Sequence, residues 1–316
     1  MGRSYLIIPA RHELQVGTEN VLVRSYEQRI LWPMFGKGRG SRTQRIVRFV
    51  VIAIVACLVW GVGIEPNLLV VRTVKVEAPL PHLRVALLSD LHAGAPFITM
   101  EKVRTIVDRI SEQHPDLVLL LGDYVVGHGS REGGVPGSTF IPIEPIVKGL
   151  ARMHPPLGVF AVLGNHDEWG ENANRTRAAF RSAQIPVLTN EAAQIQVNGA
   201  PLWLVGVGDV EVGKDDVQQA MKGVPVGAQA IVFSHEPDIF PSVPPWVALT
   251  VAGHTHGGQV ALPFIGSPVV PSRYGQLYVH GLVSQNGHQL YVTSGIGTSI
   301  LPIRLGARPE IVVIDL

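Results

Sequence analysis

The sequence has little cysteine, little charge and no internal repeat, and each of these shortages excludes a class of protein or partner. Its 316 residues include one cysteine, Cys57, so the chain can form no internal disulfide and no zinc cluster of cysteines. Charged residues make up 16% and nearly cancel to a net charge of +1, so we expect no nucleic acid as a partner. No segment repeats with a period of about 20 to 50 residues, which excludes a solenoid. The hydrophobic fraction of 46% is that of a globular protein and excludes disorder.

One apolar run is long. Residues 49–64 (FVVIAIVACLVWGVGI) carry no charge, and Ile46 and Val47 extend the run upstream around Arg48. A helix that spans a bilayer needs about 20 apolar residues, with a lower limit near ~17. We therefore predict a transmembrane or membrane-anchor helix at residues 46–66, with a buried core helix as the alternative.

The residues before this run are basic. Residues 1–48 contain nine Lys and Arg against three Glu. By the positive-inside rule, a basic segment at residues 1–45 stays in the cytoplasm, and a single-pass protein of the cell membrane exports the domain that follows. Two alternatives stay open: a helix that lies in the membrane surface and leaves the domain in the cytoplasm, and a translation start at Met34.

After an expected linker at residues 67–81, short apolar runs alternate with amphipathic stretches over residues 82–316. This alternation predicts an α/β (α+β) domain with two packed, mainly parallel or mixed sheets. The expected strands are Leu83–Ser89, Leu117–Leu121, Val159–Leu163, Leu202–Val207, Ala230–Phe233, Ala248–Val251, Leu290–Thr293 and Ile311–Ile314. The expected helices are one that begins after Thr99 as N-cap and others at residues 146–153, 173–184 and 215–221.

Polar motifs follow five of these strands. They read SDLH, GDY, GNHDE, SHEP and GHTH, and they contain five of the twelve histidines. The carboxyl ends of parallel strands meet at one edge of a sheet, and residues i and i+2 of an extended segment project to the same side. We therefore expect one site that contains Asp90, His92, Asp123, Asn165, His166, Asp167, His235, His254 and His256.

This set of ligand types is too large for one ion. A single zinc ion takes three or four ligands, whereas two ions about 3.5 to 4 Å apart use about as many as this sequence offers. The sequence therefore predicts two divalent metal ions. Mixed oxygen and nitrogen ligands favour Mn, Fe or Zn over calcium.

In this order and spacing, the motifs over residues 83–260 resemble the signature of the calcineurin-like metallophosphoesterases. GHTHGGQV and the closing stretch TSGIGTSILPIRLGARPEI are similar to the membrane-associated bacterial branch with YkuE-like and YaeI-like members. Some members of that branch are linked to hydrolysis of UDP-2,3-diacylglucosamine in lipid A synthesis.

The resemblance implies a four-layer αββα sandwich and a role for each matched residue. Asp90, His92 and His256 would hold the first metal and Asp123 would bridge. The second metal would be held by Asn165, His235 and His254. His166 would be the catalytic residue that is not a ligand, acting as leaving-group acid or charge stabiliser. The implied function is a membrane-anchored dinuclear phosphoesterase that hydrolyses a phosphodiester or pyrophosphate by in-line attack of a metal-bridging hydroxide, with a lipid-linked substrate favoured.

Other functions were weighed against this one. The narrower alternatives are a UDP-2,3-diacylglucosamine pyrophosphatase of lipid A synthesis and a non-catalytic metal-binding module. A protein phosphatase is disfavoured, because the GDxVDRG motif of those enzymes is absent after Asp123. A metallo-β-lactamase-like hydrolase is disfavoured because Gly257 and Gly258 follow the His-Thr-His motif.

Three further segments were considered for substrate contacts. Residues 127–138 form an expected loop in which His128 and Arg131 either contact phosphate or lie on a plain surface loop. Ser272, Arg273 and Tyr274 either clamp a second phosphate or form a solvated turn. Gly295, Gly297 and Thr298 either bring backbone close to the site or form a tight turn.

Overall fold

The computed structural model describes residues 41–126, 135–169 and 172–316. The expected contacts of His128 and Arg131 lie outside these residues. The chain divides into two compact units, Met1–Val50 and Val51–Leu316.

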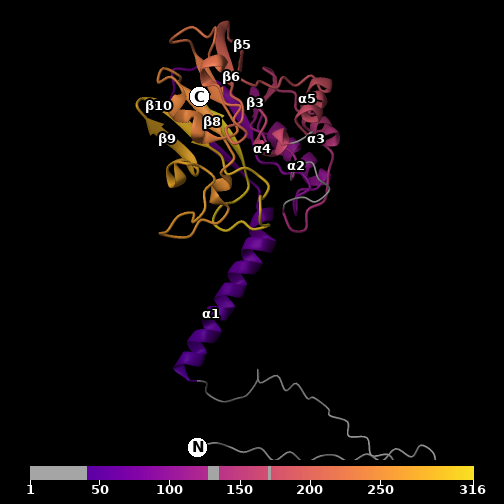
Figure 1. Cartoon of the computed structure of the whole chain (residues 1–316), viewed down its shortest axis with the longest axis vertical. Helices are drawn as coiled ribbons and strands as arrows, with labels where there is room; N and C mark the ends of the chain where they lie inside the picture. Colours follow the sequence, from indigo (N-terminus) through magenta and orange to yellow (C-terminus); the bar gives the residue numbers. More distant parts are fainter. Residues whose placement is uncertain (1–40, 127–134, 170–171) are drawn as a thin grey trace, which may run out of the picture. The chain divides into compact units, whose positions relative to one another are not determined.

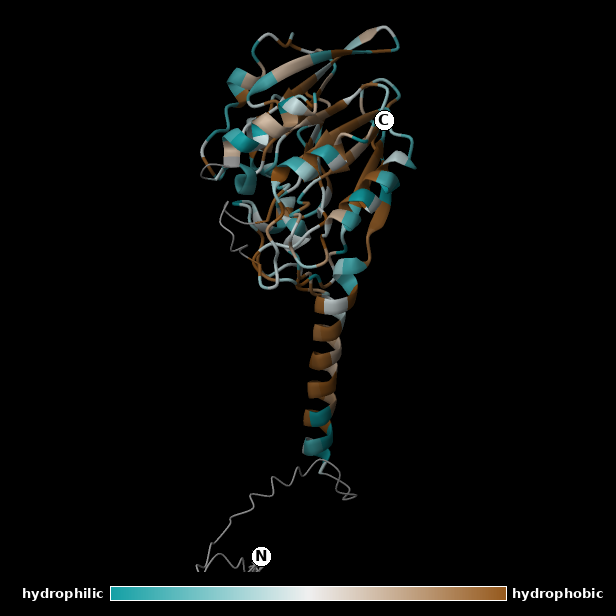
Figure 2. Ribbon diagram, turned by 90° about the vertical axis from the view of Figure 1, so that its right-hand side faces the viewer, coloured by the Kyte–Doolittle hydropathy of each residue, from teal (hydrophilic) through white to brown (hydrophobic). Residues whose placement is uncertain are grey.

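Helix α1 (Arg42–Val59) contains the first part of the long apolar run, and none of its residues is buried. Its outer surface is apolar over most of its length (Figure 2). The turns η1 (Trp60–Ile64) and η2 (Glu65–Asn67) continue it, and the apolar segment Arg42–Asn67 is long enough to cross a membrane by length and composition.

Two mixed sheets follow (Figure 1). The first has the order β1-β11-β2-β3-β4, with bounds Val70–Lys75, Glu310–Asp315, Arg84–Leu88, Leu117–Leu120 and Val159–Ala161. The second has the order β5-β6-β7-β8-β10-β9, with bounds Glu191–Val197, Ala200–Gly206, Ala230–Phe233, Leu249–Ala252, His288–Val292 and Gly281–Gln285. The strands β2, β3 and β4 run parallel, as do β6, β7, β8 and β10.

Side chains alternate between the two faces of the first sheet, and each face packs against a different layer of the fold. Leu87 and Leu119 face the second sheet, whereas Leu88 and Leu120 face the helices. On that helical side lie α2 (Met100–Ser111), α3 (Ile143–Leu150) and α5 (Asn172–Ser182) (Figure 1). The outer face of the second sheet packs against α6 (Val217–Ala220) and η3 (Pro237–Ser242). The expected four-layer αββα sandwich is thereby confirmed.

Three strands were not predicted, and all three lie at sheet edges. β1, β5 and β9 each have only one neighbouring strand, and much of each is exposed. Edge strands bury less apolar surface and carry polar residues, so their hydrophobic pattern is weak. Residues 70–75 of the expected linker accordingly form β1, which pairs with β11 in parallel from Val70 to Lys75.

The fold places all five polar motifs at one edge. β2, β3, β4, β7 and β8 each end two to four residues before a predicted ligand. Because these strands are parallel within their sheets, their carboxyl ends lie together, at the edge where open α/β sheets bind ligands.

Candidate metal centre

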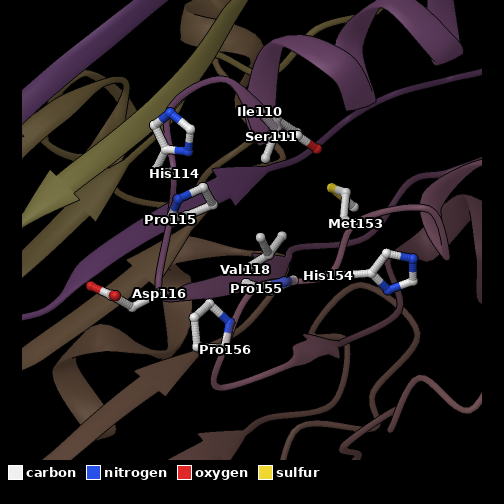
Figure 3. A pocket seen from close by; sticks show the side chains of 10 residues that line it. All are labelled: Ile110, Ser111, His114, Pro115, Asp116, Val118, Met153, His154, Pro155 and Pro156. Atoms are coloured by element: carbon white, nitrogen blue, oxygen red, sulfur yellow. The ribbon is translucent and has the colours of Figure 1, made fainter.

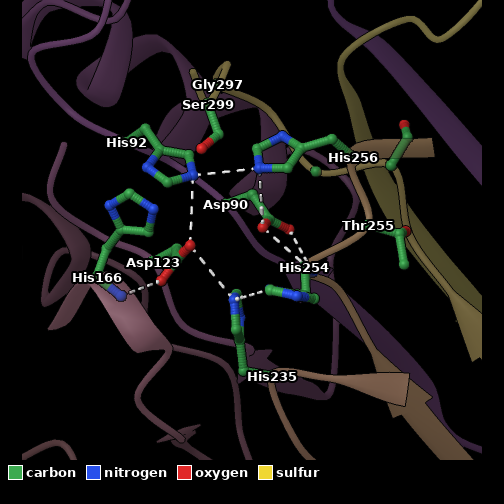
Figure 4. Close-up of polar contacts among 12 residues, drawn as sticks. Asp90, His92, Asp123, His166, His235, His254, Thr255, His256, Gly297 and Ser299 are labelled. Atoms are coloured by element: carbon green, nitrogen blue, oxygen red, sulfur yellow. Dashed lines mark hydrogen bonds and ion pairs between the residues drawn. The ribbon is translucent and has the colours of Figure 1, made fainter. Parts of the chain in front are cut away.

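The predicted ligands meet in one buried cluster (Figure 4). Asp90, His92 and His235 have no exposed surface, and Asp123 is 2% exposed. The site is built from the loops after five strands, and its side chains come from positions separated by up to 166 residues between Asp90 and His256.

One side of the cluster consists of Asp90, His92 and His256, whose ligand atoms all lie within 4.8 Å of one another. His256 Nε2 lies 3.4 Å from Asp90 Oδ1 and 3.2 Å from His92 Nε2. Two ring nitrogens and one carboxylate oxygen therefore point at a common space.

Asp123 lies between this group and the other histidines. Its Oδ2 is 3.4 Å from His92 Nε2 and 3.3 Å from His235 Nε2. His235 Nε2 in turn lies 3.1 Å from Nδ1 of His254. One carboxylate oxygen thus faces ring nitrogens on both sides, which is the position of a bridging ligand.

Backbone carbonyls orient two of these rings. His235 Nδ1 lies 2.7 Å from the carbonyl oxygen of Leu121, and His92 Nδ1 lies 3.3 Å from that of Val125. A proton on Nδ1 satisfies these carbonyls and leaves the lone pair of Nε2 toward Asp123, which is the usual outer support of a metal-binding imidazole.

Burial determines the protonation of several of the groups. It lowers the pKa of His92 and of His254 to about 3, so both rings are neutral at pH 7, the form that binds metals. Burial raises the pKa of Asp90 to about 6. Burial also opposes ionisation of Asp123, but the neighbouring imidazoles of His235 and His166 hold its pKa well below the usual value.

The backbone at the cluster is strained. Asp90, His92, Asp123, His254 and His256 have φ values of 52°, 42°, 56°, 67° and 52°. Non-glycine residues rarely adopt this left-handed region, and such outliers concentrate at functional sites.

Glycines let the loops approach each other. A Cβ on Gly164 would lie 2.3 Å from Asp123 Oδ1, and one on Gly253 would lie 1.9 Å from Ser89 Oγ. A Cβ on Gly297 would lie 2.8 Å from His92 Cβ, so the expected approach of the 295–298 backbone to the site is confirmed.

Asp167 was expected in the cluster, but its carboxylate binds backbone N–H groups instead. Its Oδ2 accepts hydrogen bonds from the backbone N–H of Asp123, at 2.7 Å, and of Gly164, at 3.0 Å. Its Oδ1 accepts from Tyr124 N at 3.0 Å. The carboxylate fastens the loop after β3 to the start of α4 (Asn165–Glu168).

Asn165 supplies a direct test of whether metal fits this site. Its side chain is 3% exposed, and among the described residues its Oδ1 has no hydrogen-bond partner. Burying an amide oxygen without a partner costs about 1–3 kcal/mol. A cation beside the imidazoles would supply the missing interaction, so the donor set fits a metal centre.

A pocket of about 570 Å³ opens onto the cluster. Asp123, Asn165, His166, His254 and His256 line part of it. Apolar residues of two loops line much of the rest, with Val260, Pro268, Val269 and Pro271 on one and Ile300, Leu301 and Ile303 on the other. Val135, Trp169 and Glu211 also contribute to the wall.

A smaller pocket, of about 370 Å³, lies between the end of α2 and the loop before β4 (Figure 3). It is lined by His114, Asp116, His154 and three prolines, and it lies at the amino ends of β3 and β4, away from the ligand motifs. The site chemistry therefore belongs to the larger pocket.

Sequence reasoning missed one buried charge. Arg304 is fully buried and donates to the carbonyl oxygens of Ser294 and Ala307, both at 2.9 Å, and to that of Gly297. Its Nη2 lies 3.4 Å from Nδ1 of His256. Arg304 thus holds the 294–307 loop against the cluster.

Of the two alternatives for residues 272–274, the structure supports the solvated turn over the phosphate clamp. Arg273 Nε donates to Asp238 Oδ2 at 3.1 Å, its side chain is 62% exposed, and it does not line the pocket. The guanidinium therefore already has a carboxylate partner and belongs to a surface turn.

The chain is similar to several known proteins. Residues 83–264 match the family model of the calcineurin-like phosphoesterases. The phosphodiesterase YaeI of Escherichia coli is 32% identical over 74% of this chain and 82% of its own length. The uncharacterized metallophosphoesterase YkuE of Bacillus subtilis is 26% identical over 80% of this chain and 87% of its own. A transmembrane protein with metallophosphoesterase domain from Danio rerio is 28% identical over 86% of this chain and 62% of its own.

The family match covers all five ligand motifs, and the fold brings their side chains together. The chain therefore belongs to the calcineurin-like phosphoesterase family, in the branch of YkuE and YaeI, and is a metal-dependent phosphoester hydrolase.

Proposed function

We propose that this chain is a membrane-anchored, dinuclear phosphoesterase that cleaves a phosphodiester or pyrophosphate on a lipid-linked substrate. The observation that supports this proposal most is the lining of the large pocket. One part of the lining consists of Asp123 and three histidines of the cluster, and much of the rest is apolar. A phosphate group with an attached apolar chain matches both parts of such a lining.

The ligands divide into two sets around Asp123. Asp90, His92 and His256 would hold the first ion, and Asn165, His235 and His254 the second, with Asp123 Oδ2 between them. Two divalent ions of Mn, Fe or Zn would lower the pKa of a water molecule and neutralise charge on the phosphoryl oxygens. The distances from Asp123 Oδ2 to His92 and His235 support this division.

His166 is placed to act on the leaving group. Its ring lines the pocket and lies 4.7 Å, centroid to centroid, from the rings of both His92 and Trp169. Its backbone N–H donates to Asp123 Oδ1 at 3.0 Å, so the residue is fixed beside the cluster. We assign it proton donation to the departing oxygen, or stabilisation of the charge that develops there.

We propose residues 46–66 as the anchor, preceded by the basic segment 1–45 and followed by the phosphoesterase domain within 82–316. The apolar length of Arg42–Asn67 and the name of the Danio rerio relative support an anchor. The basic residues before the anchor favour a cytoplasmic amino terminus and an exported domain, in a single-pass arrangement at the cell membrane.

Hydrolysis by the full chain in detergent micelles tests the function. Bis-p-nitrophenyl phosphate, p-nitrophenyl phosphate and UDP-2,3-diacylglucosamine are supplied with Mn²⁺ and after chelation, beside Asp123→Ala. We expect metal-dependent turnover that favours the diester or the pyrophosphate and is lost in the variant. Preference for the monoester would overturn the diester proposal. Turnover of the UDP-sugar above the others would select the lipid A function. No turnover by folded, metal-loaded protein would favour the non-catalytic metal-binding module.

A further inference from the structure

Exposed apolar side chains gather beside the pocket mouth. Among the described residues after Leu68, ten large hydrophobic side chains are exposed, and eight of them lie between Phe264 and Leu301. We define the apolar rim as the five at the loop tips nearest the pocket: Phe264 (fully exposed), Ile265 (71%), Val269 (73%), Ile300 (74%) and Leu301 (55%).

These side chains are presented by loops of unusual composition. Residues 257–272 (GGQVALPFIGSPVVPS) and 293–303 (TSGIGTSILPI) contain no charge. Soluble surface loops are normally polar, and exposed apolar patches mark interaction sites or membrane contacts. We therefore expect another molecule or a membrane to cover the rim.

The backbone holds the two loop tips outward. Leu262 and Gly266 exchange two backbone hydrogen bonds of 2.9 Å, which places Phe264 and Ile265 at the tip of a tight turn. Phe264 and Ile300 have φ values of 66° and 64°, a costly conformation for a bulky or β-branched residue. The backbone is therefore strained at two exposed apolar residues of the rim.

The two loops are joined to each other. Leu305 N donates to Gln259 O at 2.8 Å, and Ala261 N donates to Leu305 O at 2.7 Å. The side-chain amide of Gln259 bonds both the N–H and the carbonyl of Ser299, at 2.6 and 2.8 Å. The rim is therefore one surface built from two segments.

The same loops contact the end of the anchor. Arg304 N donates to the carbonyl of Gly61 at 2.9 Å, and a Cβ on Gly61 would lie 3.2 Å from Cγ1 of Ile303. Gly61 is the second residue of η1 and lies near the carboxyl end of the proposed anchor. Ile300 is three residues from Ile303, so at most about 11 Å of chain separates the rim from this contact.

We propose that the apolar rim rests in the bilayer interface as a second membrane contact, so that the pocket mouth opens at the lipid surface. The proposal rests on the anchor of the proposed function. The partner that covers the rim is a lipid bilayer, because the rim is continuous with the anchor segment that would already lie in the bilayer. A lipid-linked phosphate then reaches the ligands along Val269, Ile300 and Leu301 without leaving the membrane.

Depth-dependent quenching tests the proposal in the full chain. The protein is reconstituted in vesicles of equal parts phosphatidylcholine and phosphatidylglycerol, with or without lipids that carry a doxyl group on the acyl chain. Bimane is attached to the native Cys57, which lies in α1 and is exposed. In a Cys57→Ser background it is attached instead to Ile265→Cys or Ile300→Cys. The matched control is Val226→Cys, an apolar residue that is 87% exposed and precedes β7, at the sheet edge opposite the ligands.

We expect doxyl lipid to quench bimane at residues 57, 265 and 300, with a blue shift of its emission, and to leave residue 226 unquenched. Quenching at 57 alone, with 265 and 300 quenched by aqueous iodide, would overturn the proposal while the anchor stands. Protection of 265 and 300 from both quenchers would overturn it in favour of coverage by a second copy of the chain. Loss of quenching at 57 would contradict the anchor itself. Thermal melting of each variant checks that it is folded.

A kinetic experiment gives an independent readout. Phe264→Asp with Ile265→Asp places charge in the rim, and Val226→Asp places it on the opposite edge. We expect the first variant to lower the ratio of turnover on a vesicle-embedded phosphodiester to turnover on bis-p-nitrophenyl phosphate, and the second to leave the ratio unchanged. An unchanged ratio in the rim variant would contradict the proposal.

Discussion

The backbone N–H of His166 donates a 3.0 Å hydrogen bond to Oδ1 of Asp123, while Oδ2 of the same carboxylate faces His92 and His235. Asp123 therefore serves both the ligand cluster and the position of the neighbouring histidine. The side chain of His166, by contrast, can be removed without removing that backbone contact. The two residues are thus separable by experiment.

Removing the imidazole in His166→Ala should lower kcat by about 10²- to 10⁴-fold, the usual contribution of a positioned acid or base. Metal content, measured by mass spectrometry, should stay at the wild-type level. The matched control is His154→Ala, an exposed histidine in the pocket at the opposite edge. Unchanged turnover, or loss of metal together with turnover, would remove His166 from the assigned role.

Asp123→Asn, which replaces the carboxylate that we propose as the bridging ligand, should abolish turnover and lower the metal content. In the wild type, chelation should lower Tm because ions that bind only the folded state stabilise it. The variant should melt at nearly the same temperature with and without chelator. Asp108→Asn, which removes an exposed carboxylate paired with Arg152, is the control and should keep the full response to chelation. A full chelation response in Asp123→Asn would show that Asp123 is not a ligand.

A methyl group added by Gly164→Ala would collide with the cluster. Its Cβ would lie 2.3 Å from Asp123 Oδ1 and 2.9 Å from His235 Cδ2. We expect destabilisation of about 1–3 kcal/mol in chemical unfolding, together with weaker metal binding. Gly149→Ala in α3 is the control, since its Cβ would make only ordinary contacts, with Val103 at 3.4 Å and Met100 at 3.9 Å, and alanine favours the helix. Equal effects of the two substitutions would contradict the close approach.

Acidic pH should lower the free energy of unfolding of the domain, because Glu310 becomes protonated. Burial opposes its ionisation, but hydrogen bonds from His280 and Arg72 lower its pKa to about 2, against an ordinary 4.5. Its carboxylate also accepts from Thr293 Oγ1 and Ser294 N, both at 3.0 Å. A depressed pKa contributes stability that is present above about pH 4.5 and is lost as the pH falls toward 2, worth at most about 3 kcal/mol.

Thermal melts between pH 6 and pH 3 measure this loss. Glu310→Gln should be less stable than the wild type at pH 6, and the difference should shrink at pH 3. Glu144→Gln is the control, because Glu144 is half-exposed and pairs with Arg175 at the surface. A difference that stays constant with pH would contradict the depressed pKa of Glu310.

The sequence predicted the central strands because they are buried on both faces and read as continuous apolar runs. β3 is Leu-Val-Leu-Leu and has no exposed residue. The edge strands β1, β5 and β9 carry polar residues among apolar ones and were missed. Their formation depends on a neighbour from elsewhere in the chain, as β1 depends on β11, and no local pattern records that partner.

At the site, the sequence identified the side chains that converge but not what fixes them. Leu121 and Val125 orient histidines through backbone carbonyls, so their side chains give no signal. Arg304 was not predicted, since nothing local shows that an arginine is buried among carbonyls. Asp167 was grouped with the ligands by proximity in sequence, whereas its carboxylate binds three backbone N–H groups.

The position of β11 between β1 and β2 also constrains when the first sheet can be completed. β11 follows every other described strand in the chain, yet it lies inside the first sheet, and β1 has no other strand beside it. During synthesis, this sheet keeps an open gap until residues 310–315 have emerged, and such long-range pairing is slow to form. β2, which leads into Asp90 and His92, therefore has its β11 neighbour only once the end of the chain is available.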